Sequence, residues 1–246
     1  MRLILVLLFL SCCLEVSAQH LPFYGSLREP SNLSNLYFGA SISGSISFDN
    51  TSIPILEKQI ECCRFEKGST KQFSVGASTE YWLEPQWTIG GTVGFISQST
   101  VVSKESLPIP RREKPPLVTE YTGTIQSTVL FVQPQTKYRI SGTNLSVGTA
   151  FSVGVPFSPT STLTENDVSE QISGNPLFTE KTLLGFDQSL QSILLEPSIL
   201  IGYDFPIRNG QYLSSTTHIG YRPYLLKNQD FTSISLRLQI SYLFGI

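Results

Sequence analysis

The stretch that decides the fold is the closing segment "ISLRLQISYLFGI", residues 234–246. In an extended strand, successive side chains point to opposite faces. One face of this strand is polar, with Ser235, Arg237, Gln239 and Ser241. The other face is apolar and consists of Ile234, Leu236, Leu238, Ile240, Tyr242, Phe244 and Ile246. A water-soluble protein would turn the apolar face towards a core, so the fold depends on which face lies inside.

The composition is poor in charge for a chain of 246 residues. Charged residues make up 15% of it, against roughly 25% in typical soluble domains. The formal net charge is −2, so no basic excess exists to neutralise phosphates, and a nucleic-acid partner is excluded. Low charge together with 18 glycines indicates a surface that does not face water everywhere.

Residues 1–18 have the pattern of an export signal, with an apolar run over 3–10 and the small-residue sequence "VSA" before the expected cleavage site. The run is shorter than the roughly 20 residues of a membrane helix. A helical membrane protein is therefore excluded, since no later apolar stretch is longer. We expect a signal peptide over 1–18, a periplasmic segment over 19–34 and one domain over 35–246. Lipid attachment at Cys12 or Cys13 is the alternative for the leader.

Period-two alternation recurs along the mature chain and predicts strands. The segments are 36–48, 72–84, 86–103, 121–140, 143–157, 187–206, 211–225 and 231–245. Their connections alternate in length. "EPQ", "SGT" and "IRNGQ" are short and rich in turn formers. The other connections are 49–71, 104–120, 158–186 and 226–230, and three of these four are long and polar.

This alternation predicts an all-β fold, an eight-stranded antiparallel up-and-down transmembrane β-barrel with short periplasmic turns and long extracellular loops. A β-sandwich has no reason to sort its connections by length. An interior of eight strands is just wide enough for side chains, and the large apolar residues would overfill it. We therefore expect the apolar faces to point into lipid.

Two further strands show the same division, and two others are less regular. "LSVGTAFSVGVPF" (145–157) and "FSVGASTEYWL" (73–83) each set large apolar residues against small and polar ones. The outward set of the strand over 211–225 is only weakly apolar. The strand over 121–140 changes phase near its middle, and because Pro134 removes a ladder donor there, we predict a bulge.

The chain resembles the small eight-stranded outer-membrane barrels, similar to the transmembrane domain of outer membrane protein A and to the outer membrane beta-barrel group of Bacteroidota. The resemblance covers the whole mature chain. It is carried by the Gly/Ser-alternating strands, the closing "LQISYLFGI" (238–246) and the segment "IECCRFEKGS" (60–69). It implies an outer-membrane location, with membrane lipid, lipopolysaccharide and the barrel-insertion machinery as partners.

Charged residues within the strands fall on the inward face. The predicted lumen cluster consists of Glu80, Gln133, Lys137, Arg139, Glu196, Asp204, His218, Arg222, Arg237 and Gln239. Buried charges must be paired and hydrogen-bonded. We expect a polar plug that fills the lumen and sets strand register; the alternative is an ion path opened when pairs exchange partners.

Aromatic residues gather near the strand ends assigned to the short turns. They predict a girdle at the periplasmic interface, because amphipathic rings favour the headgroup level. Its members are Tyr37, Trp82, Trp87, Tyr138, Phe205, Tyr212, Tyr242 and Phe244.

The remaining candidate residues point weakly to chemistry. His218, with Ser214 and Glu196 nearby, is a candidate for a lipid-hydrolysing triad. Cys62 and Cys63, placed in the first long loop, are candidates for a strained disulfide that stiffens the loop.

Two charged loop segments are expected to be solvated. "RREK" (111–114) could alternatively contact lipopolysaccharide phosphates through Arg111, Arg112 and Lys114. "TENDVSEQ" lacks the spacing of a calcium loop.

These features predict a non-enzymatic outer-membrane protein with a structural or surface-interaction role through its loops, without a cofactor or metal. A narrow gated pore and a lipid-modifying enzyme using His218 are the alternatives. The loops would bind an extracellular ligand that the residues do not identify.

Overall fold

The computed structural model describes residues 35–57, 60–105, 109–111, 114–167, 181–182, 191–208, 210–223 and 231–246. The expected signal peptide, the lipid-attachment alternative and the segment over 19–34 therefore lie outside the described residues. Within the described part, no helix is long and apolar enough to cross a membrane.

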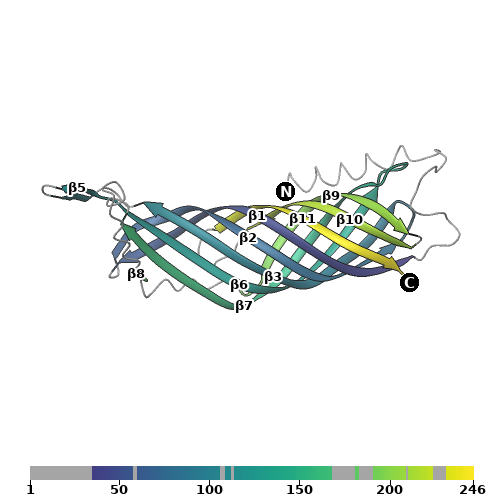
Figure 1. Ribbon diagram of the computed structural model, residues 1–246, viewed down its shortest axis with the longest axis horizontal. Coiled ribbons are helices and arrows are strands. Elements are labelled where there is room, and N and C mark those ends of the chain that lie inside the picture. The colour runs from purple at the N-terminus through teal and green to yellow at the C-terminus, as the bar shows by residue number, and fades with distance from the viewer. Residues whose placement is uncertain are drawn as a thin grey trace, which may run out of the picture.

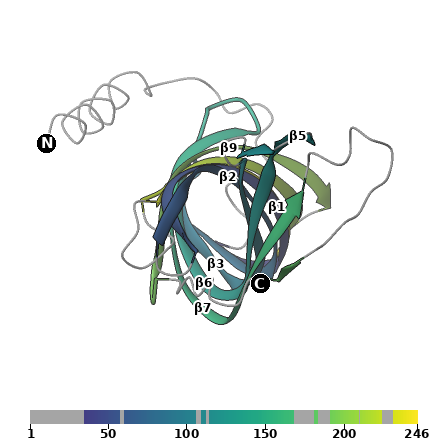
Figure 2. The ribbon, with the colours of Figure 1, turned by 90° about the vertical axis from the view of Figure 1, so that its left-hand side faces the viewer.

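Eight long strands form one closed antiparallel ring (Figures 1 and 2). They are β1 (Leu36–Glu57), β2 (Ile60–Trp82), β3 (Trp87–Glu105), β6 (Thr119–Arg139), β7 (Leu145–Asp167), β9 (Leu194–Arg208), β10 (Gln211–Arg222) and β11 (Phe231–Gly245). Each pairs with the next along the chain, and β1 closes the ring on β11. The predicted up-and-down barrel is confirmed.

The two ends of the barrel differ. Short turns join β2 to β3, β6 to β7 and β9 to β10, and Gly142 and Gly210 adopt φ of +74° and +76° in two of them, a conformation that glycine adopts without strain. The opposite end carries the hairpin of β4 (Ile109–Arg111) and β5 (Lys114–Leu117), and β8 (Lys181–Thr182), which pairs with β7. In Figure 1 the C-terminus lies at the end away from β5 and β8.

The apolar faces point outward. In β11, Ile234 and Leu238 are 59% and 52% exposed, whereas Arg237 and Gln239 are buried. Val75 in β2 and Ile240 in β11 are likewise exposed. A barrel with an apolar belt on its exterior and charged and polar side chains inside that belt is the outer-membrane type, so the chain is an eight-stranded barrel of this kind.

The strands are longer than the sequence predicted. Residues 49–71, expected as a long loop, belong almost entirely to β1 and β2, which pair from Leu36 and Tyr81 up to Glu57 and Ile60. In this extension large apolar side chains face inward and polar ones face outward, the reverse of the arrangement nearer the short turns. Ile53 and Phe65 are fully buried inside, while Asn50 and Lys67 are exposed outside.

The predicted change of phase in the strand over 121–140 is wrong. Alternate residues of β6 face inward without interruption from Tyr121 to Arg139, and Pro134 keeps its place opposite Gly91 of β3. What changes is the chemistry of the inward face, which is mainly apolar up to Phe131 and polar from Gln133 onward. The sequence pattern therefore reflected a change of surroundings rather than a bulge.

A bulge lies instead in the neighbouring strand β7. The pairing passes from Thr128 opposite Phe157 to Gln126 opposite Thr160, which leaves one extra residue in β7. Ser158 in this step has φ of +52°. An extra residue exchanges the two faces of a strand, and Leu163 beyond it is accordingly buried inside.

The interior consists of three layers along the barrel axis. Near the loops an apolar layer gathers buried side chains, Ile53, Phe65, Ile96, Val102, Tyr121, Ile125, Val129, Phe131, Leu163, Leu194 and Phe231. Near the short turns lies a second apolar cluster of Tyr37, Trp82, Tyr212 and Leu243. Between them lies the charged layer.

The lumen as candidate functional site

All ten residues predicted for the lumen are buried within the barrel, each with at most 5% of its surface exposed. They come from five strands. β2 supplies Glu80; β6 supplies Gln133, Lys137 and Arg139; β9 supplies Glu196 and Asp204; β10 supplies His218 and Arg222; β11 supplies Arg237 and Gln239. Strict alternation places them on one face of each strand, and closure of the ring brings the faces together.

Glu196 is the centre of the upper part of the charged layer. Arg222 donates to its Oε2 at 2.5 Å, and Arg237 donates to its Oε1. The Ser235 hydroxyl lies 3.2 Å from the same Oε1, and the other terminal nitrogen of Arg237 donates to Gln133 Oε1 at 3.2 Å. Strands β6, β9, β10 and β11 are thereby joined through the lumen.

The lower part contains two ion pairs. Lys137 pairs with Glu80, whose second oxygen accepts from the Tyr212 hydroxyl at 2.6 Å. Arg139 pairs with Asp204, and its guanidinium carbon lies 4.4 Å from the centre of the Trp82 ring, a distance at which cation–π attraction operates.

The buried charges balance, but only when one residue missed from the sequence is included. Asp49 is 5% exposed and accepts from the Thr70 hydroxyl at 2.6 Å. With it, the described interior holds four buried carboxylates (Asp49, Glu80, Glu196, Asp204) against four cations (Lys137, Arg139, Arg222, Arg237), so 4 − 4 = 0. Asp49 was missed because the first strand was ended at residue 48; continuing the alternation one further step would have found it.

Side chains fill the lumen closely around the charges. A void of about 10 Å³ lies beside Glu196, Arg222 and Arg237, with apolar walls that include Phe131 and Leu194. A space of this size holds about one water molecule. The ring that looks open as a ribbon in Figure 2 is therefore occupied at this level.

His218 is integrated into the same packing. It is 1% exposed; its Nε2 lies 3.1 Å from the Thr216 hydroxyl, and its Nδ1 lies 3.5 Å from the Gln133 amide. Ser214 is within 3.4 Å of the Lys137 ammonium, and Glu196 binds two arginines. The three residues of the candidate triad thus contact other partners in the described structure.

The residues predicted for the aromatic girdle lie on both faces of the barrel wall. Trp87, Phe205, Tyr242 and Phe244 are 41–47% exposed on the outside, and Tyr138 packs on Trp87 with ring centres 5.0 Å apart. Tyr37, Trp82 and Tyr212, which are at most 4% exposed, face inward.

These three aromatics were misplaced because position near a strand end does not decide which face a side chain occupies. In its own strand, each of the three falls on the same alternate positions as the residues that point inward. They close the turn end of the lumen, where the rings of Tyr37 and Tyr212 meet edge to face at 5.1 Å.

Several predicted residues cannot be placed at the level of side chains. Cys62 and Cys63 lie in β2 rather than in a loop, but their side chains are outside the described residues. The same holds for the side chains of Arg111 and Lys114 and for the whole of Arg112. Glu165, Asp167 and Glu170 also lie outside the description of side chains. Among the described residues, no three His, Cys, Asp or Glu are grouped as a metal site.

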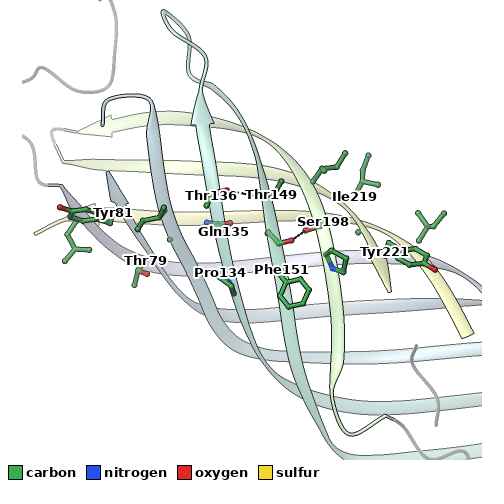
Figure 3. A pocket seen from close by; sticks show the side chains of 18 residues that line it. Thr79, Tyr81, Pro134, Gln135, Thr136, Thr149, Phe151, Ser198, Ile219 and Tyr221 are labelled. Atoms are coloured by element: carbon green, nitrogen blue, oxygen red, sulfur yellow. Dashed lines mark hydrogen bonds between the residues drawn. The ribbon is translucent and has the colours of Figure 1, made fainter. Parts of the chain in front are cut away.

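A hollow of about 1150 Å³ lies along the outside of the barrel wall (Figure 3). Outward side chains such as Tyr81, Phe151, Ile199, Ile219 and Tyr221 border it. Because this surface faces hydrocarbon, we expect lipid acyl chains to fill the hollow, and we assign it no catalytic or binding role.

Comparison with known proteins gives no family. No known protein-family profile matches the chain, and no curated protein matches it. Among solved structures, the chain is similar to the attachment invasion locus protein Ail of Yersinia pestis, in complex with the heparin analogue sucrose octasulfate (9% identity, 85% of this chain, 99% of that chain, TM-score 0.30).

Two other solved structures show comparable similarity. They are Neisserial surface protein A (10% identity, 84% of this chain, 97% of that chain, TM-score 0.30) and the outer membrane protease OmpT from Escherichia coli (8%, 94%, 100%, 0.33).

Proposed function

We propose that the protein is a non-enzymatic, non-conducting barrel of the bacterial outer membrane, which holds its long loop-end strands and loops at the cell surface for contact with an external ligand. The observation that carries the proposal is the filled lumen. Eight strands leave little internal width, and here that width is taken by three successive layers of side chains.

The charged layer supports a structural plug rather than a gate. Each of Glu80, Glu196 and Asp204 contacts a cation from another strand, and the described buried charges sum to zero. Opening a path would separate buried pairs, which costs several kcal/mol for each uncompensated charge.

A lipid-modifying enzyme using His218 is the weaker candidate. A general base must come within hydrogen-bonding reach of its nucleophile and its substrate. His218 is 1% exposed and contacts Thr216 and Gln133, and the wall separates it from lipid.

Planar-bilayer recording tests the proposal. The purified full chain should give no discrete conductance steps, while its migration on gels should change on boiling, as a closed barrel requires. Steps that disappear when Arg237→Gln is introduced would instead establish the gated pore.

The enzymatic alternative has its own measurement. Mass spectrometry of lipid A incubated with the wild type and with His218→Ala should show the same acyl composition in both samples. Loss of acyl chains with the wild type alone would establish the enzyme.

A further inference from the structure

The lipid-facing belt ends within one step along β3 and β6, and one step later along β7, where Phe157 opposite Thr128 is still apolar and 43% exposed. Phe95, Leu130 and Val155 lie opposite one another across these strands and are 44–52% exposed. Two residues further towards the loops, Ser97 lies opposite Thr128. A step of two residues is about 7 Å along a strand, so the surroundings change here from hydrocarbon to the headgroup level.

A hollow of about 330 Å³ lies immediately above this edge. It is lined by Ser97, Gln98, Ser99, Gln126, Ser127, Thr128, Ser158 and Thr160. The hollow is at the small end of ligand sites by volume. Gln98 and Ser127 turn their side chains into the lumen, where they are hydrogen-bonded to each other. The outward lining therefore consists of five hydroxyls and the amide of Gln126, groups that both donate and accept hydrogen bonds, and this chemistry matches a sugar.

The bulge of β7 forms one side of the hollow. Ser158, the residue with φ of +52°, borders it together with Thr160. Just below, the Phe95 and Phe157 rings meet edge to face with centres 6.3 Å apart. The hollow therefore has polar groups on its walls and exposed aromatic edges at the membrane side.

A cation stands beside the hollow at the same height. Lys71 of β2 is exposed and lies opposite Ser99, which lies opposite Gln126 of β6. Neighbouring strands are about 5 Å apart, so the ammonium group can reach over the hollow. Phe73, 56% exposed, continues the apolar belt directly below Lys71.

We propose that the hollow and Lys71 together bind the phosphorylated sugar headgroup of a glycolipid in the outer leaflet: the sugar lies among Ser99, Gln126 and Thr160, and a phosphate pairs with Lys71. The proposal rests on the proposed function in one respect, namely that the loop end faces outward. The acyl chains of the bound glycolipid would lie on Phe95, Leu130 and Val155. Charge-assisted hydrogen bonds to phosphate are the stronger ones, so Lys71 should supply the larger part of the affinity.

Native mass spectrometry of the detergent-solubilised full chain, titrated with rough-type lipopolysaccharide, tests this site. We expect Lys71→Gln to weaken binding about tenfold, equivalent to one such contact, and Gln126→Leu, which removes the amide from the hollow, to weaken it several-fold. Lys67→Gln is the matched control, since Lys67 is exposed on the same face of β2 about 13 Å further from the belt. It should bind like the wild type.

Two further titrations separate the parts of the ligand. Removing the phosphates of the lipopolysaccharide should weaken binding to the wild type about as much as Lys71→Gln does, with little further loss in that variant. Phosphatidylglycerol should bind much more weakly than the glycolipid. Equal binding of phosphatidylglycerol, or equal losses for Lys67→Gln and Lys71→Gln, would overturn the proposal.

Failure of the site is distinguishable from failure of the proposed function. The same preparations should show the gel shift on boiling and no conductance. A variant that loses the gel shift has lost the barrel and is replaced by Ser99→Leu, which narrows the hollow.

Discussion

Midway along β11, Leu238 points outside and Arg237 inside, whereas at the loop end of the same strand Thr232 points outside and Phe231 is completely buried. The half that crosses the membrane and the half that projects beyond it thus have opposite arrangements. Lipid accepts apolar side chains and water accepts polar ones, so one continuous sheet presents each solvent with the side chains it favours. The comparison shows where the membrane ends.

The largest expected effect comes from breaking the charged layer of the membrane half. Glu196→Leu leaves Arg222 and Arg237 buried without their carboxylate, and loss of one partner of a buried pair costs about 3–5 kcal/mol. Urea unfolding in lipid vesicles, followed by tryptophan fluorescence, measures the change.

The control for this prediction removes both partners of another pair. Replacing Glu80 and Lys137 together by Leu and Met should cost less than either single replacement. A double variant less stable than both single ones would contradict the account of paired burial.

The next effect concerns the apolar core of the loop half. Phe65→Ala removes a fully buried ring and should lower the free energy of unfolding by about 3 kcal/mol. Phe73→Ala, on the outside of the same strand, is the matched control; because lipid replaces the lost contacts, its effect should be smaller. Equal losses in the same unfolding assay would mean that the loop half has no core of its own.

A charge placed on the exterior sharpens the boundary between the halves. Leu238→Arg puts a cation into the hydrocarbon belt and should cost about 2 kcal/mol or more. Thr124→Arg, on the exterior of β6 near the loops, should cost at most about 0.5 kcal/mol because it stays in water. Urea unfolding of both variants measures the two costs. If both were small and equal, Leu238 would lie in water, and the edge of the membrane would be closer to the short turns than inferred here.

The smallest effect lies at the bulge between the halves. Ser158 holds φ of +52°, which costs a residue with a side chain about 1 kcal/mol relative to glycine. Ser158→Gly should therefore raise stability by about that amount, while Thr160→Gly, the control next to it, should lower stability. The same urea titration resolves the sign.

The outward sets of the membrane half were predictable because hydrocarbon on one side imposes strict alternation. To place Leu145, Val147 and Phe151 outside and Ser146 and Ser152 inside, only two premises were needed: a side-chain period of two and the narrow interior of an eight-stranded barrel. The charged layer was predictable for the same reason, since a charge within an alternating strand faces the lumen. Asp49 was missed because the alternation was followed only as far as its apolar members.

The inward aromatics could not be predicted from their height alone. Trp82 and Trp87 both flank one turn, yet one lies under Arg139 and the other faces outward. Parity within each strand would have separated them. Trp82 closes the base of the lumen together with residues of β6 and β10, which are distant from it along the chain.

The alternation of side chains by itself determined the barrel class and its outward apolar face, because a strand that separates two solvents must divide its residues by parity. Only the closed tertiary structure decided which charges pair, where the inward face turns apolar and which residue of β7 bulges. Those features depend on what stands across the lumen and across neighbouring strands, and side chains from eight separate segments meet there only after the ring has closed.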